Sequence, residues 1–321
     1  MTLPERIWVA GANGMVGSAV VRALTARGLA PIATTRAEVD CTDPASVRAF
    51  LAKTKPQGIV LAAAKVGGIH ANNTQRADFI WANLMVAATV IEAAHRAGVS
   101  HVLNLGSSCI YPRLCPQPMR EEHLLTGALE PTNEPYAVAK IAGLKLIESF
   151  NHQYGHQWCS VMPTNLYGPF DNYDLNNSHV LPAMLRKFHE AAQEGHRPVT
   201  VWGNGTALRE FLHVDDMAAA CVFAMERQEQ IAALPGAFAN VGSGAEITIR
   251  TLAETVQRAV GHRGEIIWDE SKPNGAPRKL LDSSRLLGLG WKPHHTLDSG
   301  LAQTYASFLA NETRGLLRPL K

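Results

Sequence analysis

The sequence lacks the cysteine spacing that builds a disulfide framework or a structural zinc site. Its five cysteines are an odd number, and no two of them form a Cys-x-x-Cys pair. They are Cys41, Cys109, Cys115, Cys159 and Cys221. We therefore expect five free thiols in this chain.

Strong net charge and long hydrophobic runs are also missing. The formal net charge of +2 gives no global basic field, so nothing in the composition indicates a nucleic-acid partner. A local site for a small anionic substrate is still compatible with this charge. The most apolar interior run, residues 58–64, is broken by Lys65 and is too short to cross a bilayer. The N-terminal residues lead directly into an apolar run at Ile7, without room for a signal peptide. We expect a cytoplasmic protein with no membrane partner.

What is present is an alternation of short β-branched runs with amphipathic segments. The 321 residues, of which 46% are hydrophobic, can bury a large core. Strands are expected at residues 7–10, 31–34, 58–62, 101–105 and 159–162, and helices at about 16–27, 46–53, 79–97 and 136–154. This alternation predicts an α/β fold with a doubly wound parallel sheet of the Rossmann type.

The pattern changes after Gly168, where longer loops rich in Asn, Gly and Pro begin. We expect the chain to return to the sheet with a strand at 209–214, a helix after Asp216 and a strand at 238–241. This predicts a cofactor-binding domain of residues 1–166 plus about 209–242. A smaller, discontinuous substrate domain would contain about 167–208 plus 243–321.

A glycine motif marks the first strand-to-helix turn. Gly11, Gly14 and Gly17 follow one predicted strand and open a predicted helix, the context in which this spacing binds the pyrophosphate of a dinucleotide. The alternative is a glycine-rich turn without a ligand. At the end of the second strand Arg36 suits the 2′-phosphate of NADP. The alternative there is a solvated Arg36, with Glu38 or Asp40 binding the ribose of NAD.

Three further residues predict reduction of a carbonyl group. Tyr136 and Lys140 share one helix face, and Ser107 follows the carboxyl end of a predicted strand. Tyr136 would protonate the carbonyl oxygen, and Ser107 would orient it. Lys140 would keep the phenol acidic and hold the cofactor ribose. The alternative for the Tyr-x-x-x-Lys pair is an ordinary solvated helix face.

Two more side chains suggest proton transfer at carbon. Cys109 lies two residues beyond Ser107, and a thiol can carry a proton when its pKa is brought toward neutrality. His179, in a polar loop, is a candidate partner. The alternatives are a cysteine that only packs and a histidine that only bonds a backbone carbonyl.

Several long strings resemble the GDP-L-fucose synthase family of extended short-chain dehydrogenases/reductases. They are the glycine motif and residues 62–73, 106–112, 130–140, 162–168, 177–180 and 209–216. The resemblance spans nearly the whole chain. It implies an NADPH-dependent enzyme that epimerises C3 and C5 of GDP-4-keto-6-deoxy-D-mannose and then reduces C4, giving GDP-L-fucose. It also implies a homodimer that pairs the helices at 79–97 and 136–154.

The resemblance assigns roles to residues by position. Cys109 would be the base and His179 the acid of epimerisation. The GDP-sugar would contact Lys187, Trp202, Arg209 and Asn274. NADPH would contact Gly11, Asn13, Gly14, Met15, Val16, Gly17, Arg36, Leu105, Gly106, Ser107, Lys140, Pro163, Thr164, Asn165, Leu166 and His179. Ala12-Asn13 stands where some members carry His-Arg, which shifts recognition of the 2′-phosphate onto Arg36.

Other readings compete with this one. A sugar-nucleotide 4,6-dehydratase would need an Asp-Glu pair where Ser108-Cys109 stands, and a simple 4-epimerase would need no Cys base. A sister epimerase/reductase could act on another GDP-keto-sugar, of the GDP-colitose or GDP-deoxyheptose type. From another class, the chain could be a catalytically silent NADP-binding sensor. The string His213-Val-Asp-Asp216 is interpreted as structural, with Asp216 as a helix N-cap and no metal site.

Overall fold

The centre of the protein is a parallel six-stranded sheet. A computed structural model describes residues 3–175, 177–272 and 275–315. The sheet has the strand order β2-β1-β3-β4-β5-β9, and every pair in it is parallel. Its strands are β1 (Ile7–Ala10), β2 (Ile32–Ala33), β3 (Gly58–Leu61), β4 (His101–Leu105), β5 (Cys159–Pro163) and β9 (Phe238–Val241). The predicted doubly wound α/β fold is confirmed.

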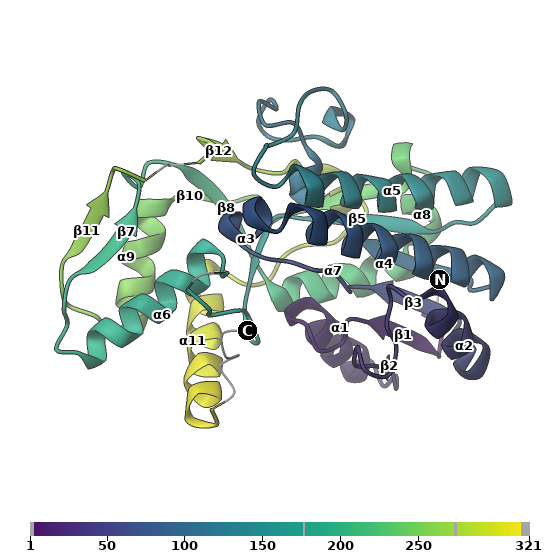
Figure 1. Cartoon of the computed structure of the whole chain (residues 1–321), viewed down its shortest axis with the longest axis horizontal. Coiled ribbons are helices and arrows are strands. Elements are labelled where there is room, and N and C mark those ends of the chain that lie inside the picture. The colour runs from purple at the N-terminus through teal and green to yellow at the C-terminus, as the bar shows by residue number, and fades with distance from the viewer. Residues whose placement is uncertain (1–2, 176, 273–274, 316–321) are drawn as a thin grey trace.

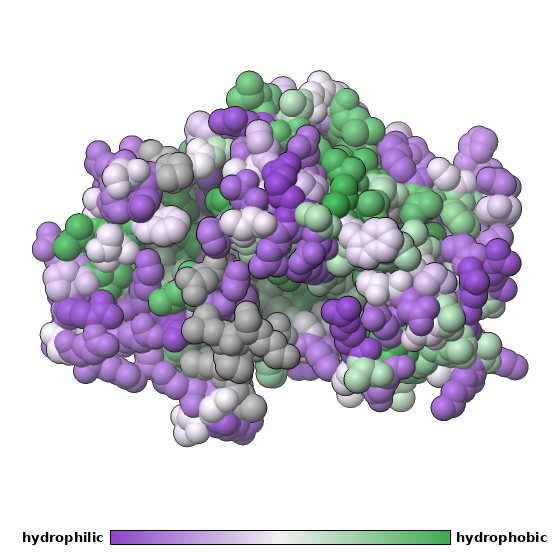
Figure 2. All heavy atoms as spheres, viewed as in Figure 1, coloured by the Kyte–Doolittle hydropathy of each residue, from purple (hydrophilic) through white to green (hydrophobic). Residues whose placement is uncertain are grey.

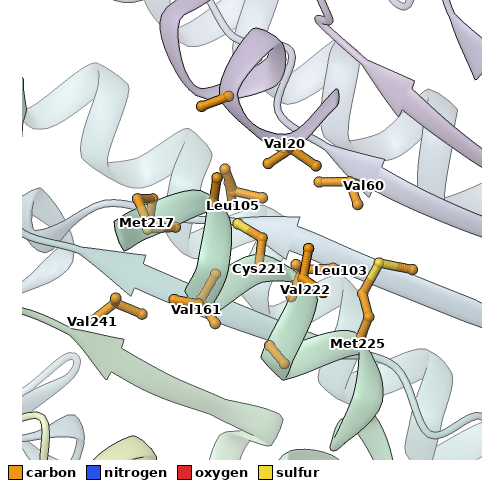
Figure 3. Packing of buried hydrophobic residues seen from close by; sticks show 14 of the residues in the cluster. Val20, Val60, Leu103, Leu105, Val161, Met217, Cys221, Val222, Met225 and Val241 are labelled. Atoms are coloured by element: carbon orange, nitrogen blue, oxygen red, sulfur yellow. The ribbon is translucent and has the colours of Figure 1, made fainter. Parts of the chain in front are cut away.

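Helices cover both faces of this sheet (Figure 1). One face packs against α1 (Met15–Ala26) and α7 (Val214–Glu226), and the other against α2 (Pro44–Thr54), α4 (Arg76–Arg96) and α5 (Glu134–Tyr154). Strand β1 serves both layers, because Ile7 and Val9 point into one cluster and Trp8 into the other. Figure 3 shows side chains of α7, such as Met217, packed over the strands.

Short helices occupy the connections of this part of the chain. They are α3 (Ile69–Thr74), α8 (Gln228–Ala232) and the 3₁₀ turns η1 (Ser108–Ile110), η2 (Glu121–His123) and η3 (Pro235–Ala237). Of these, η1 follows β4 and α3 follows β3, so both lie beyond the carboxyl ends of central strands. That edge of an open α/β sheet is where ligands bind.

A second region, at the left of Figure 1, has its own sheets and helices. Strands β10 (Glu246–Thr248), β8 (Leu208–His213) and β12 (Arg278–Lys279) form one sheet, in which β6 (Asn165–Tyr167) also pairs with β8. Strand β7 (Val199–Trp202) pairs with β11 (Ile266–Asp269). The helices are α6 (Val180–Gln193), α9 (Ile249–Val260) and α11 (Leu297–Thr313), whereas α10 (Ser284–Gly288) packs against β9 of the central sheet. Only Thr164 separates β5 from β6, so the chain passes directly from the central sheet to the second one.

The structure corrects one expected return to the central sheet. Helix α7 and strand β9 do return there, but the strand expected at 209–214 does not, because β8 pairs with β6, β10 and β12. Four residues of β8, 210–213, are buried. An apolar, buried strand looks the same in the sequence whichever sheet it joins. The division into two domains stays a prediction, and Leu286 and Trp291, beyond the expected boundary, pack with the core of the central sheet.

All five cysteines are free thiols, as expected. Among the described residues one helix, α4, is long and apolar enough to cross a membrane, with half of its apolar stretch buried inside the protein. It packs against α5 and α2, as a core helix does.

Candidate active site

The turn from β1 to α1 fits a bound dinucleotide. Gly11 has a φ of +85°, and a Cβ built on Gly17 would lie 2.1 Å from the Gly11 carbonyl oxygen. Gly14 is the N-cap of α1 and offers no side chain to the first N–H groups of the helix. Those N–H groups and the helix dipole suit a pyrophosphate. Met15 and Val16 begin the helix, and Asn13 lies exposed in the turn before it.

The residues on which the two interpretations of cofactor recognition depend follow β2. Arg36 has a side chain that is 82% exposed, with only a 3.6 Å ion pair to Asp40. Both competing carboxylates are engaged locally. Glu38 accepts hydrogen bonds from Thr35, and Asp40 accepts from Thr42. Arg36 as the residue that binds the 2′-phosphate stays a prediction.

Ser107, Tyr136 and Lys140 come together beyond β4. Tyr136, in the first turn of α5, is hydrogen-bonded to Ser107. The ammonium of Lys140 donates to the carbonyl oxygen of Leu105 at 2.8 Å and lies 5.7 Å from the centre of the Tyr136 ring. Burial lowers the pKa of Lys140 to about 8. The expected carbonyl-reducing group is thus assembled, from the end of β4 and the start of α5.

The sequence predicts that Lys140 favours the ionised form of the Tyr136 phenol, but the surroundings of the phenol act in the opposite direction. Burial raises the pKa of the Tyr136 phenol, the nearby Cys109 raises it further, and the Ser107 hydrogen bond lowers it only in part. The ammonium of Lys140 is turned to the Leu105 carbonyl instead of the phenol oxygen. A neutral phenol is the form that can donate a proton to a carbonyl oxygen.

The thiol of Cys109 has a partner that the sequence did not suggest. Asn133 donates from Nδ2 to the Cys109 sulfur at 3.3 Å. Asn133 is the N-cap of α5, yet its side chain caps no helix N–H group. An amide donor and a helix N-terminus both stabilise a thiolate. An asparagine before Glu-Pro is typical of an ordinary helix N-cap, so the sequence pattern does not predict this contact with the thiol.

His179 lies at the start of α6. It is the N-cap residue of α6, and its side chain is exposed to solvent although protein surrounds it closely enough for burial to lower its pKa. No hydrogen bond between described residues joins His179 to Cys109 or Tyr136.

The remaining cofactor residues follow the ends of β4 and β5. A Cβ on Gly106 would lie 2.0 Å from the Met162 sulfur, so the backbone there is packed against β5. Thr164 and Asn165, after Pro163, donate to the Glu210 carbonyl oxygen of β8. Leu166 follows in β6. These segments place the expected cofactor contacts on one edge of the sheet.

The expected substrate residues lie in the second region. Lys187 of α6 donates to the Thr200 carbonyl oxygen at 3.3 Å, and Arg209 lies on β8. Burial lowers the pKa of both side chains. Trp202, at the end of β7, is 63% exposed, with the Lys272 ammonium 5.8 Å from its ring centre. Asn274 lies outside the described residues.

The string at the start of α7 is arranged differently from the expectation. His213, not Asp216, is the N-cap, and it accepts from the Asp215 N–H. Asp216 accepts from the backbone N–H groups of His294 and His295. An Asp two residues into a helix resembles a cap in sequence, but here its carboxylate holds a neighbouring loop.

His213, Asp215 and His295 also lie close enough together to be considered for a metal ion. The guanidinium of Arg22 is 2.6 Å from Asp215, where it already supplies positive charge. His295 Nδ1 is 3.0 Å from Asp216. These contacts favour a structural role for the cluster.

Comparison with known proteins agrees with this geometry. Residues 7–242 match the NAD dependent epimerase/dehydratase family, so the chain belongs to that class of nucleotide-binding enzymes. A GDP-L-fucose synthase from Escherichia coli (strain K12) is 53% identical over 97% of this chain and 98% of its own length. GDP-L-fucose synthase 1 from Arabidopsis thaliana is also 53% identical, over 95% of this chain and 94% of its own length. Within the class, the chain belongs to the GDP-L-fucose synthase family.

A solved structure also resembles this chain over nearly its whole length. GDP-D-glycero-L-gluco-heptose synthase from Campylobacter jejuni, in the presence of NADPH, has a TM-score of 0.89 and is 32% identical. The match covers 96% of this chain and 99% of that one. The family expected from the sequence is confirmed.

Proposed function

We propose that this protein converts GDP-4-keto-6-deoxy-D-mannose to GDP-L-fucose with NADPH, as a 3,5-epimerase and 4-reductase. The observation that carries the proposal is the meeting of Ser107, Tyr136 and Lys140 with Cys109 at the edge of a dinucleotide-binding sheet. A simple reductase needs the first three residues only. A thiol with its own amide donor adds the means for proton transfer at carbon.

Epimerisation depends on the ketone at C4, which makes the protons at C3 and C5 acidic. Cys109 as thiolate takes the proton, and the electron pair of the broken C–H bond moves to the C4 oxygen. Ser107 and Tyr136 stabilise that oxygen by hydrogen bonds. His179 then delivers a proton to the carbon from the opposite face, which inverts it.

Reduction uses the same oxygen site. NADPH, when bound, supplies the hydride for C4. Tyr136 donates its phenol proton to the oxygen, Ser107 orients the carbonyl, and Lys140 holds the cofactor ribose. Lys187, Trp202 and Arg209 bind the GDP portion of the substrate, since Arg209 suits pyrophosphate and Trp202 offers an exposed aromatic face.

We also propose a cytoplasmic homodimer. Exposed apolar side chains gather on and beside the α3, α4 and α5 segment, namely Val66, Ile69, Trp81 and Val138. Figure 2 shows hydrophobic residues over these helices on the face in view. An apolar patch on two long helices that pack side by side suits a two-fold contact with a second copy.

The experiment is incubation with GDP-4-keto-6-deoxy-D-mannose and NADPH in D₂O, with NMR of the product. The proposal expects L-galacto configuration with deuterium at C3 and C5. A product reduced at C4 without inversion would contradict the epimerase half. Turnover only with a GDP-colitose or GDP-deoxyheptose precursor would move the assignment to a sister enzyme, for which the 32% identical heptose synthase is the structural precedent. NADPH binding without any turnover would favour the alternative of a catalytically silent NADP-binding sensor.

A further inference from the structure

A close backbone contact joins the loop after β3 to the loop that carries His179. The N–H of Gly68 donates to the Asn177 carbonyl oxygen at 2.9 Å. A Cβ built on Gly68 would lie 2.8 Å from the Ser178 carbonyl oxygen. The φ of Gly68 is −67°, which any residue can adopt. Glycine is therefore needed at position 68 because the two loops approach each other so closely, and not because of its own backbone conformation.

Both sides of this contact are held by buried polar groups. On one side Asn72, 6% exposed, donates from Nδ2 to the carbonyl oxygens of Gly67 at 2.7 Å and Gly68 at 3.0 Å. On the other side Asp174, also 6% exposed, accepts from the side chain of Asn177 at 2.7 Å. The Asp174 carbonyl oxygen accepts from the Ser178 N–H at 2.7 Å. The contact thus joins two turns that each have a fixed shape.

His179 is the next residue after this contact and the N-cap of α6. Its side chain makes no cap hydrogen bond, so the backbone at 177–178 decides where the imidazole stands. Gly68 belongs to the layer of the central sheet, whereas His179 begins a helix of the second region. Cys109 is held by other elements, the 3₁₀ turn after β4 and the start of α5.

We propose that Gly68 and Asn72 are positioning residues for His179. They fix the position of the imidazole, and so its reach to the face of the sugar opposite Cys109. This inference rests on the proposed function, in which Cys109 removes a proton from carbon and His179 returns one from the other face. A displacement of about 1 Å at a proton donor can cost on the order of a hundredfold in rate.

The two proton transfers can be read separately in D₂O without NADPH. Cys109 alone can remove and return a hydron on its own face, which gives deuterium at C3 or C5 with retained configuration. Inversion requires His179. Gly68→Ala places a methyl group against the Ser178 carbonyl, so it should lower inversion at least tenfold. Exchange with retention should stay within about threefold of wild type.

Gly67→Ala is the matched control. A Cβ there meets only side-chain carbons, of Ala71 and Phe79, both at 3.1 Å. Inversion in this variant should stay within about threefold of wild type. Asn72→Ala is a second test that adds no bulk, and it should also lower inversion more than retentive exchange.

A double-mutant cycle decides whether Gly68 acts through His179. In a His179→Asn background, Gly68→Ala should lower the residual inversion by less than twofold, because the group it positions is already absent. The inference would be overturned if Gly68→Ala and Asn72→Ala lowered inversion and retentive exchange equally. It would also be overturned if Gly68→Ala lowered inversion as much in the His179→Asn background as in the wild-type protein. Absence of any exchange in the wild-type protein would instead refute the proposed function.

Discussion

Lys140 is an ammonium group enclosed by protein beside a phenol. Its pKa in the folded protein is about 8, below the usual 10.5 of the unfolded chain. Between these values the unfolded chain binds more protons, so this residue makes stability rise with pH from about 8 to 10.5. Below pH 8 its unfavourable contribution is constant.

We therefore expect the melting temperature of cofactor-free Lys140→Met, minus that of wild type, to be largest near pH 7.5. The difference should shrink as the pH is raised to 10. Thermal unfolding at several pH values, followed by circular dichroism, measures it. A difference that does not change with pH would contradict the burial of this charge.

Cys109 acts on carbon atoms of the substrate and Tyr136 on the C4 oxygen. Substitutions at the two residues should therefore impair different activities. Cys109→Ser should lower deuterium exchange at C3 and C5 about a hundredfold or more, because a serine hydroxyl, unlike a thiol, does not ionise near neutral pH and its neutral oxygen is a poor base. Tyr136→Phe should abolish NADPH oxidation and keep some exchange if Ser107 alone holds the enolate. Wild-type exchange in Cys109→Ser would show that the thiol only packs, with His179 the next candidate for the base.

Arg36 is the residue on which cofactor choice depends. Because its guanidinium is exposed and suited to a 2′-phosphate, Arg36→Ala should raise the KM for NADPH far more than the KM for NADH. Steady-state kinetics with both cofactors measures this. Equal effects on the two KM values would refute the assignment.

At the residue scale, the sequence predicts those site members whose spacing carries their chemistry. The four-residue step from Tyr136 to Lys140 and the strand end before Ser107 are sufficient to place them together. The amide of Asn133 on the Cys109 sulfur joins residues 24 positions apart, so it depends on how the turn after β4 meets α5. The pKa of Tyr136 likewise depends on burial, which sequence spacing does not measure.

The first βα unit is the element on which cofactor binding depends. Gly17→Ala would put a methyl carbon 2.1 Å from the Gly11 carbonyl oxygen, so helix and turn must separate. We expect loss of NADPH binding, measured by fluorescence titration, together with a lower melting temperature. Gly288→Ala, where a Cβ meets nothing within 4 Å, should bind NADPH normally. Wild-type affinity in Gly17→Ala would place the pyrophosphate elsewhere.

At the element scale, hydrophobic periodicity predicts which segments are helix or strand but not every boundary or partner. Strand β4 has the expected bounds, whereas β2 pairs over only Ile32–Ala33 of the expected 31–34. Helix α2 begins at Pro44, earlier than expected, because Asp43 caps it by accepting from the Ala45 N–H. The sheet that β8 joins depends on contacts between distant segments, which periodicity along one segment does not contain.

The assembly state is a property of the whole molecule. Trp81 on α4 is 67% exposed and lies in the apolar patch proposed as the dimer contact. Trp81→Arg should therefore shift light scattering from about twice the chain mass toward the 34.7 kDa of one chain. Leu309→Arg, on α11 in the second region and 37% exposed, is the control that should stay dimeric. A wild-type protein with the mass of one chain would refute the homodimer.

The direct passage from β5 to β6 limits how the two regions can move. Thr164, the one residue between these strands, donates its N–H to Val241 of the central sheet and its hydroxyl to Glu210 of the second. Because this single residue is hydrogen-bonded to both sheets, the sheets cannot rotate freely about it, and relative motion of the two regions has to arise in other connecting segments. Amide hydrogen exchange at Thr164 should accordingly be among the slowest in the protein, whether or not substrate is bound.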